Sequence, residues 1–248
     1  MGLAPGQPVR AGVLGSRLKR ASLIFGVLIF SILILLTLVF QAFVAVPALS
    51  GPAALPEKLA GLEQRIRNYT VDPRYRDDVL GLHVVRAALA SAKQGSGGIG
   101  ACLVDTAAGK VVETGRNRQY EPYFRSDLHA EMDLLNRYED RVRKAHSRDA
   151  DSNPRDCSGL VLVSSVEPCP MCLTRIINAG INTVLYVETD EQGGMATRIR
   201  DLPPFWREFA RDREFRRADC SPHLRKIAHD LFHLSKRSFA KNRKKWFK

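Results

Sequence analysis

A histidine, a glutamate and two cysteines have the types and the order of a catalytic metal site. A His-Ala-Glu string begins at His129, and a later Pro-Cys-Pro-Met-Cys string carries Cys169 and Cys172. One imidazole and two thiolates are ligands that zinc accepts, and a catalytic zinc site keeps its fourth position for water. The carboxylate of Glu131 is then left beside the metal, where it can move protons. These residues predict a hydrolytic Zn²⁺ centre with His129, Cys169 and Cys172 as ligands and Glu131 as the catalytic residue.

Each part of this pattern also fits another chemistry when it is taken alone. Cys-x-x-Cys next to a strand and a helix is typical of a thioredoxin-type redox dithiol. A single histidine is more often a surface residue than a ligand. The upstream His-Ala-Glu string and Glu167-Pro168 favour the zinc site.

Two helix starts are needed to bring these residues to one ion. Ser126 or Asp127 is expected to cap a helix with His129 and Glu131 in its first turn. Residues two apart on a helix diverge by roughly 200°, so the metal must lie beyond the N-terminal end. Pro170 suits the first position of a second helix, which carries the cysteines. The positive ends of both helix dipoles would then favour thiolate over thiol.

The wider pattern predicts a three-layer α/β/α sandwich with a mixed sheet. Short apolar runs without polar alternation are expected to be strands covered on both faces. A strand, a helix and a strand with short connections imply a parallel pair. Helices are expected from Asp72-Pro73 to about Lys93, from Ser126 or Asp127 onward and from Pro170 to Gly180, and strands at 99–104, 111–114, 160–163 and 183–187, the first two as a hairpin.

From about Asp72 to Thr197 the sequence resembles the bacterial tRNA adenosine deaminases and their relatives among the guanine and cytosine deaminases. His-x-Glu followed by Pro-Cys-x-x-Cys is a signature of zinc deaminases. The matching strings are ACLVD at 101–105, GRNR at 115–118, HAEM at 129–132, VEPCPMC at 166–172 and TVLY at 183–186.

The resemblance implies a cytidine deaminase-like fold and assigns roles to the matching residues. His129, Cys169 and Cys172 would hold zinc, Glu131 would shuttle protons, and Asn117 would contact the base or sugar. The stretch 124–128 reads Phe-Arg-Ser-Asp-Leu, where relatives commonly have an Asp-Pro-Thr-type string, so the pocket rim and the substrate choice stay open.

The expected activity is zinc-dependent hydrolytic deamination of a cytosine-, guanine- or adenine-type nucleobase or nucleoside, with release of ammonia. Glu131 would pass a proton from the attacking water to the ring nitrogen and the departing amine. One alternative is adenosine-to-inosine deamination in tRNA. The other is a non-catalytic nucleic-acid or lipid binding protein, against which an intact Glu131 argues. A homodimer also stays open.

An uncharged segment near the N-terminus predicts a transmembrane helix. No charged residue lies between Arg20 and Glu57, and the 26 residues 21–46 would span roughly 39 Å as a helix, against about 30 Å for a bilayer core. A signal peptide usually has a shorter apolar core, so a retained single-pass anchor is favoured. Four basic residues precede it, whereas the following flank is mixed in charge. The positive-inside rule therefore places the N-terminus in the cytoplasm and the catalytic domain outside, which conflicts with a cytosolic tRNA substrate.

The chain accordingly divides into five segments. They are a basic N-terminal segment (1–20), the anchor (21–46), a Pro/Ala linker (47–56), the zinc deaminase domain (57–197) and a basic C-terminal helical region (198–248). Of the formal net charge of +12, most lies at the C-terminal end, where residues 196–248 contain 16 Lys and Arg against 6 Asp and Glu. This excess favours RNA or anionic lipid as a partner, or else a solvated basic helix face. Residues 231–237 loosely resemble the helix that covers the active site in tRNA adenosine deaminases.

The remaining cysteines and histidines raise one further metal question. Cys102, Cys157 and Cys220 are an odd number that does not describe a disulfide framework, and Cys102 is expected in the core. A second metal site formed by Cys220, His223, His229 and His233 stays open on their spacing, although helical histidines are usually only polar residues.

Overall fold

The computed structural model describes residues 54–146, 157 and 159–246, and a five-stranded mixed sheet lies at the centre of this part of the chain. The strand order is β2 (Lys110–Arg116), β1 (Gly100–Asp105), β3 (Leu160–Val166), β4 (Thr183–Glu188) and β5 (Glu214–Arg217). β1 runs antiparallel to β2 and to β3, whereas β3, β4 and β5 are parallel. The predicted hairpin and the predicted parallel pair are both present.

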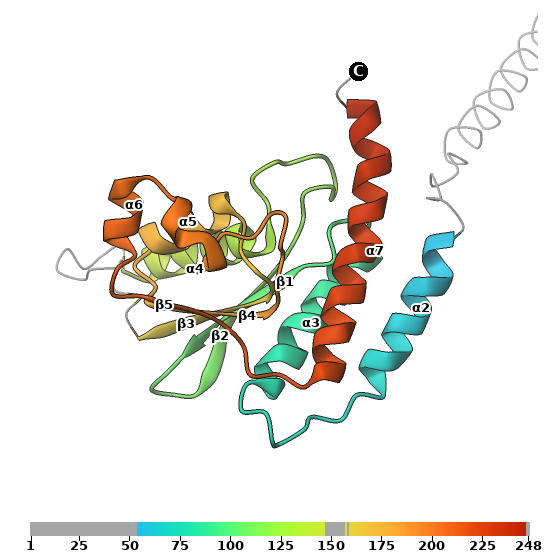
Figure 1. Ribbon diagram of the computed structural model, residues 1–248, viewed down its shortest axis with the longest axis horizontal. Helices are drawn as coiled ribbons and strands as arrows, with labels where there is room; N and C mark the ends of the chain where they lie inside the picture. The colour runs from blue at the N-terminus through green and yellow to red at the C-terminus, as the bar shows by residue number, and fades with distance from the viewer. Residues whose placement is uncertain (1–53, 147–156, 158, 247–248) are drawn as a thin grey trace, which may run out of the picture. The chain divides into compact units, whose positions relative to one another are not determined.

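Helices cover both faces of the sheet (Figure 1). One face carries α4 (Ala130–His146), α5 (Pro170–Asn178) and the short α6 (Pro204–Phe209). The other carries α3 (Asp78–Lys93) and α7 (Pro222–Trp246), and α2 (Ala54–Arg67) packs against these two helices. The predicted three-layer α/β/α sandwich with a mixed sheet is therefore confirmed.

Strand β1 shows how the sequence builds a core on each face. Cys102 and Val104 pack with α2, α3 and α7, whereas Ala101 and Leu103 pack with α4 and α5. Successive strand side chains point to opposite faces, so an apolar strand without polar alternation needs helices on both sides. Cys102 is fully buried, as the sequence predicts.

Helix α3 begins later than the Asp72-Pro73 pair predicts. It starts at Asp78, while the Asp72 carboxylate accepts the Arg74 N–H (3.0 Å) and the Asp72 carbonyl accepts the Tyr75 N–H (3.1 Å). Aspartate side chains often bond to nearby backbone groups outside helices. Asp72 therefore closes a turn instead of capping the helix.

The chain beyond residue 197 continues the same sheet and core. β5 pairs with β4, and α7 packs on α3 with Leu224, Ile227 and Leu231 fully buried. The sequence analysis does not identify β5, because an edge strand of the composition Glu-Phe-Arg-Arg has no apolar run. The segment predicted as a basic helical region thus contributes an edge strand and a core helix.

The predicted basic segment (1–20) and anchor (21–46) lie outside the described residues. Of the predicted linker (47–56), the structure describes only the end, where α2 begins at Ala54. Within the described ranges, no helix combines the length and apolar character required to span a bilayer.

Candidate active site

His129 and Cys169 each stand directly before a helix. α4 starts one residue after His129, whose carbonyl accepts the Asp133 N–H (2.8 Å), and α5 starts one residue after Cys169, whose carbonyl accepts the Leu173 N–H (2.9 Å). The sequence analysis places His129 in the first turn, but it lies one residue earlier, while Glu131 is in the first turn as predicted. A residue at the cap position can direct its side chain beyond the helix end, where the backbone N–H groups are free.

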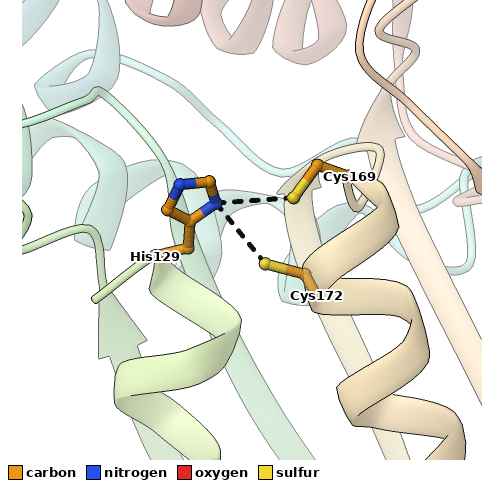
Figure 2. A group of neighbouring side chains, drawn as sticks. All are labelled: His129, Cys169 and Cys172. Carbon is orange, nitrogen blue, oxygen red and sulfur yellow. Dashed lines mark hydrogen bonds between the residues drawn. The ribbon is translucent and has the colours of Figure 1, made fainter. Parts of the chain in front are cut away.

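The ligand atoms of His129, Cys169 and Cys172 face one another (Figure 2). Nδ1 of His129 lies 3.5 Å from Sγ of Cys169 and 3.5 Å from Sγ of Cys172, and the three ligand atoms lie within 4.8 Å of one another. Tetrahedral zinc, with its usual bond lengths to nitrogen and sulfur, holds these atoms about 3.6 Å apart. The three residues therefore fit a zinc ion and leave one of its four positions open. Across the described ranges, this is the one group of its kind.

The two thiols interact directly. Hydrogen bonds from the Cys172 thiol and from His129 together lower the pKa of Cys169 to about 4, although burial opposes the change. The hydrogen bond between the two thiols, together with burial, raises the pKa of the Cys172 thiol. One sulfur is thus already a thiolate at neutral pH. A bound cation would favour the thiolate form of the second, because metal binding displaces the thiol proton.

Glu131 lies next to this cluster and is 3% exposed. Its Oε1 accepts a hydrogen bond from the hydroxyl of Ser164 (2.9 Å), a fully buried residue of β3. Burial raises the pKa of Glu131, and the negative charge of Cys169 adds to the effect. A carboxyl group with a raised pKa is better suited to take up and release a proton near neutral pH than an exposed one.

A cavity of about 370 Å³ opens onto the cluster. Its polar lining consists of Asn117, Gln119, His129, Glu131, Glu167, Cys169, Asp190 and Gln192, and its apolar lining includes Ile99, Val166 and Phe232. The cavity size is within the usual range for small-molecule sites. The metal-ligand cluster and Glu131 therefore face a space that can hold a small ring.

Asn117 follows β2 directly and is 2% exposed. Its backbone N–H donates to the Ile99 carbonyl (3.0 Å), and its carbonyl accepts the Ser91 hydroxyl (2.6 Å). Its side-chain Oδ1 accepts the Gln119 N–H (3.0 Å), and Nδ2 donates to Oε1 of Gln119 (3.2 Å). These hydrogen bonds hold both the backbone and the side chain of Asn117 at the cavity wall.

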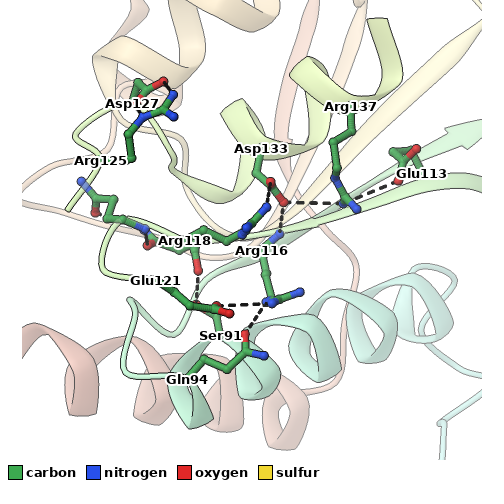
Figure 3. A network of polar contacts seen from close by, with 12 residues as sticks. Ser91, Gln94, Glu113, Arg116, Arg118, Glu121, Arg125, Asp127, Asp133 and Arg137 are labelled. Atoms are coloured by element: carbon green, nitrogen blue, oxygen red, sulfur yellow. Dashed lines mark hydrogen bonds and ion pairs between the residues drawn. The ribbon is translucent and has the colours of Figure 1, made fainter. Parts of the chain in front are cut away.

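Figure 3 shows a polar network behind the loop that carries Asn117. Asp133 of α4 accepts hydrogen bonds from the backbone N–H of Arg116 (3.3 Å) and the guanidinium of Arg118 (3.5 Å), and it pairs with Arg137 (3.5 Å). Arg116 and Arg118 flank Asn117 in the chain. The network therefore fixes the position of Asn117 relative to α4.

The four residues considered for a second metal site do not gather. The Cys220 thiol donates to the Asp77 carbonyl (3.4 Å), and His223 stacks on Tyr69. The rings of His229 and His233 lie 4.1 Å apart, and His229 contacts Glu188. Since no second ligand cluster occurs in the described parts of the chain, this hypothesis is not supported.

Sequence analysis misses several cavity residues. They are Gln119, Glu167, Asp190, Gln192 and Phe232, of which Glu167 and Phe232 lie inside strings already noted for another reason. The remaining three come from loops without a local signal. Only the tertiary fold brings such loops to one cavity.

Comparison with known proteins agrees with this site. Residues 76–188 match the model of the cytidine and deoxycytidylate deaminase zinc-binding region. The chain is 31% identical over 147 residues to a Rattus norvegicus protein named "Probable inactive tRNA-specific adenosine deaminase-like protein 3", a match that covers 47% of this chain and 40% of the relative. The chain thus spans about two fifths of the length of this curated relative.

Solved structures of deaminases are similar over part of the chain. A structure from a study of A-to-I editing by tRNA:A34 deaminases is 25% identical, with 49% of this chain and 85% of that chain covered and a TM-score of 0.39. The guanine deaminase of Nitrosomonas europaea is 17% identical, with 75% and 94% covered and a TM-score of 0.43. Residues 76–188 are thus similar to the cytidine and deoxycytidylate deaminase zinc-binding region, and the His-Cys-Cys cluster lies inside this match.

Proposed function

We propose that this protein catalyses the zinc-dependent hydrolytic deamination of a nucleobase or nucleoside, with release of ammonia. The observation that carries the proposal is the buried carboxylate of Glu131, which lines the same cavity as His129 and Cys169. Burying an ionisable carboxyl group is costly. A binding protein would gain nothing from this cost, whereas a deaminase needs a proton carrier at this place.

The residues of the chain divide the work between them. Zinc held by His129, Cys169 and Cys172 would supply a water molecule activated as the nucleophile. The water oxygen bonds to the amine-bearing ring carbon, and Glu131 carries one proton of this water to the ring nitrogen. It then carries the second proton from the same oxygen to the amine, which leaves as ammonia when the carbon–nitrogen bond breaks. The Ser164 hydroxyl, bonded to Oε1, restricts the rotation of the carboxylate and so keeps it aimed at both proton positions.

The cavity lining supports a neutral ring as substrate. Neither lysine nor arginine is among its lining residues, whereas Glu131, Glu167 and Asp190 are. A phosphate placed inside would face these carboxylates and be repelled. The amides of Asn117 and Gln119 can both donate to and accept from the edge of a base. A free base or nucleoside, or a base turned out of a nucleic acid, is therefore favoured over a mononucleotide whose phosphate enters the cavity.

Adenosine deamination in tRNA is the second candidate function. Phe232 supports it, because this α7 residue lines the cavity and belongs to the basic C-terminal region that would attract RNA phosphates. The name of the rat relative refers to tRNA-specific adenosine deaminases, although it describes that protein as a probable inactive one. We place the small substrate first, because the proposed external location of the domain separates it from cytosolic tRNA.

The first prediction concerns zinc. The domain is expected to bind one zinc ion per chain, and His129→Ala, Cys169→Ser and Cys172→Ser should each lose it, because two protein ligands hold zinc poorly. Glu131→Gln should retain the metal and lose turnover by roughly 10²- to 10⁴-fold. Metal analysis and ammonia release measure the two effects. Cys220→Ser is the control and should keep its zinc, because Cys220 lies in the core between the sheet and α3 and α7. An unchanged zinc content in Cys172→Ser would refute the ligand assignment.

The second prediction concerns Ser164. Ser164→Ala removes the hydroxyl that orients Glu131, so kcat should fall about 10-fold, which corresponds to about 1.4 kcal/mol, with zinc content unchanged. Ser165→Ala is the matched control on the same strand, because the Ser165 hydroxyl instead accepts the Gly100 N–H (3.0 Å). It should lower Tm and leave kcat nearly constant. Equal kcat values for the two variants would contradict the orienting role.

The third prediction concerns the substrate. Asn117→Ala should weaken transition-state binding by about 1 to 3 kcal/mol, because a hydrogen bond to a buried base is lost. Ammonia release from free bases, nucleosides and an anticodon stem-loop identifies the substrate. Inosine formed only in the stem-loop would establish the tRNA function instead. No release from any of them would favour the non-catalytic binding protein.

The fourth prediction concerns residues 21–46, which we propose to anchor the protein in a membrane. Full-length protein should remain with membranes after carbonate extraction, because a helix of this length buries its apolar side chains in lipid. Protease added to intact cells should digest the catalytic domain. Protection of that domain would show that it faces the cytoplasm, and extraction by carbonate would refute the anchor.

A further inference from the structure

One wall of the cavity is formed by residues 189–197, which comprise the connection between β4 and the 3₁₀ helix η1 (Ala196–Asp201) and the first two residues of η1. We call this segment the 189–197 loop. Asp190, Gln192 and Gly193 of this loop line the cavity. Apart from Gln119, the other lining residues belong to a strand or helix or directly adjoin one, whereas this loop has no regular structure between residues 189 and 195 apart from a turn. Its position therefore depends on contacts to neighbouring segments.

The buried side chain of Glu167 bridges the two ends of this loop. Its Oε1 accepts hydrogen bonds from the backbone N–H (2.7 Å) and the hydroxyl (2.8 Å) of Thr197, and its Oε2 accepts the Asp190 N–H (3.2 Å). Glu167 is 3% exposed, and no ion pair formed within the described residues includes it. The carboxylate is therefore stabilised by donors of the loop itself, and hydrogen bonds to a buried charge are stronger than neutral ones.

Gly194 shows how closely the loop fits around this carboxylate. A Cβ atom at this position would lie 2.4 Å from Cδ and 2.5 Å from Oε2 of Glu167. The Gly194 N–H donates to the Asp190 carbonyl (2.7 Å), so the turn closes directly over the carboxylate. A glycine is therefore required here by space.

Glu167 also connects the loop to the metal-ligand cluster. It precedes Cys169 by two residues, and the carbonyl of the intervening Pro168 accepts the Met195 N–H (2.9 Å). The backbone N–H of Glu167 donates to the Glu188 carbonyl (2.7 Å) at the end of β4. One short segment thus carries a ligand, the bridging carboxylate and a link to the strand from which the loop departs.

We propose that Glu167 is a positioning residue that fixes the 189–197 loop at a set distance from the metal-ligand cluster and thereby determines which ring fits the cavity. The inference rests on the proposed deaminase function. Asp190 and Gln192 of the loop line the cavity together with Asn117, so a shift of the loop changes the polar groups that a substrate meets. The chemistry at Glu131 is unaffected, because Glu131 is held by β3 and α4.

The test compares Glu167→Gln, Thr197→Val and Glu191→Gln. Glu167→Gln keeps the shape but places an amide NH₂ where one of the loop donors needs an acceptor. Thr197→Val removes one hydroxyl donor and keeps the backbone N–H. It is a milder change that tests the same contact if Glu167→Gln folds poorly. Glu191→Gln removes an exposed charge from the same loop without touching Glu167 and is the matched control.

Three measurements are made on each full-length variant: zinc content, hydrogen exchange of the 189–197 amides, and kcat and KM on the best substrate. For Glu167→Gln we expect one zinc per chain, loop exchange faster by roughly 10-fold or more, and KM raised by roughly 10-fold with kcat within about 3-fold. Thr197→Val should show the same pattern more weakly, and Glu191→Gln none of it.

The outcomes separate this inference from the proposed function. Loop exchange equal to that of Glu191→Gln would overturn the positioning role, even in a protein without measurable turnover. Faster exchange with unchanged KM would overturn the link between the loop and substrate choice. A fall in kcat alone, or a loss of zinc, would assign Glu167 to the metal centre and overturn the inference as well. Absence of activity in the unchanged protein would refute the deaminase proposal. The hydrogen-exchange experiment would still show whether Glu167 holds the 189–197 loop in place.

Discussion

Two helix N-termini must be held within a few tenths of an ångström for His129, Cys169 and Cys172 to share one ion. The distances of 3.5 Å from Nδ1 to each sulfur match tetrahedral zinc, and zinc bond lengths vary little. The 3.5 Å contact between His129 and Cys169 does not set this accuracy by itself. The accuracy comes from the core between α4, α5 and the sheet, where Leu134, Leu162 and Ile176 are fully buried. The geometry of the metal-ligand cluster therefore depends on the packing of core residues that do not touch the metal position.

Three buried carboxyl groups in and around the site have different hydrogen-bond partners. Asp133 receives arginine side chains and a backbone N–H, and Glu167 receives donors of the 189–197 loop. Glu131 has the Ser164 hydroxyl, and burial raises its pKa. The first two carboxylates hold neighbouring segments in place, whereas burial favours the protonated form of Glu131. The carboxyl group suited to proton exchange is therefore the one that lies beside the metal-ligand cluster.

The parts that sequence predicts well are those whose signal is local. The ligand strings and the strands β1 to β4 follow from residue types and apolar runs, and Pro170 marks the start of α5. Asp72 misleads because its side chain competes for backbone donors, and a turn satisfies it as well as a helix start does. His129 falls outside the first turn because its side chain must reach past the helix end. β5 and the cavity residues Gln119 and Gln192 carry no local signal, since an edge strand and a cavity wall are defined only by their neighbours.

Helix α7 contributes both to the hydrophobic core and to the cavity. Leu231 is buried in the core against α3, and the next residue, Phe232, lines the cavity. Neighbouring residues on a helix point roughly 100° apart, so one turn of α7 serves both places. The Ser235 hydroxyl one turn later accepts the Gly98 N–H (2.9 Å), beside Ile99 in the cavity wall. The pocket and the core therefore share one helix, and the basic C-terminal region cannot shift as a unit without changing the space in which a substrate ring would lie.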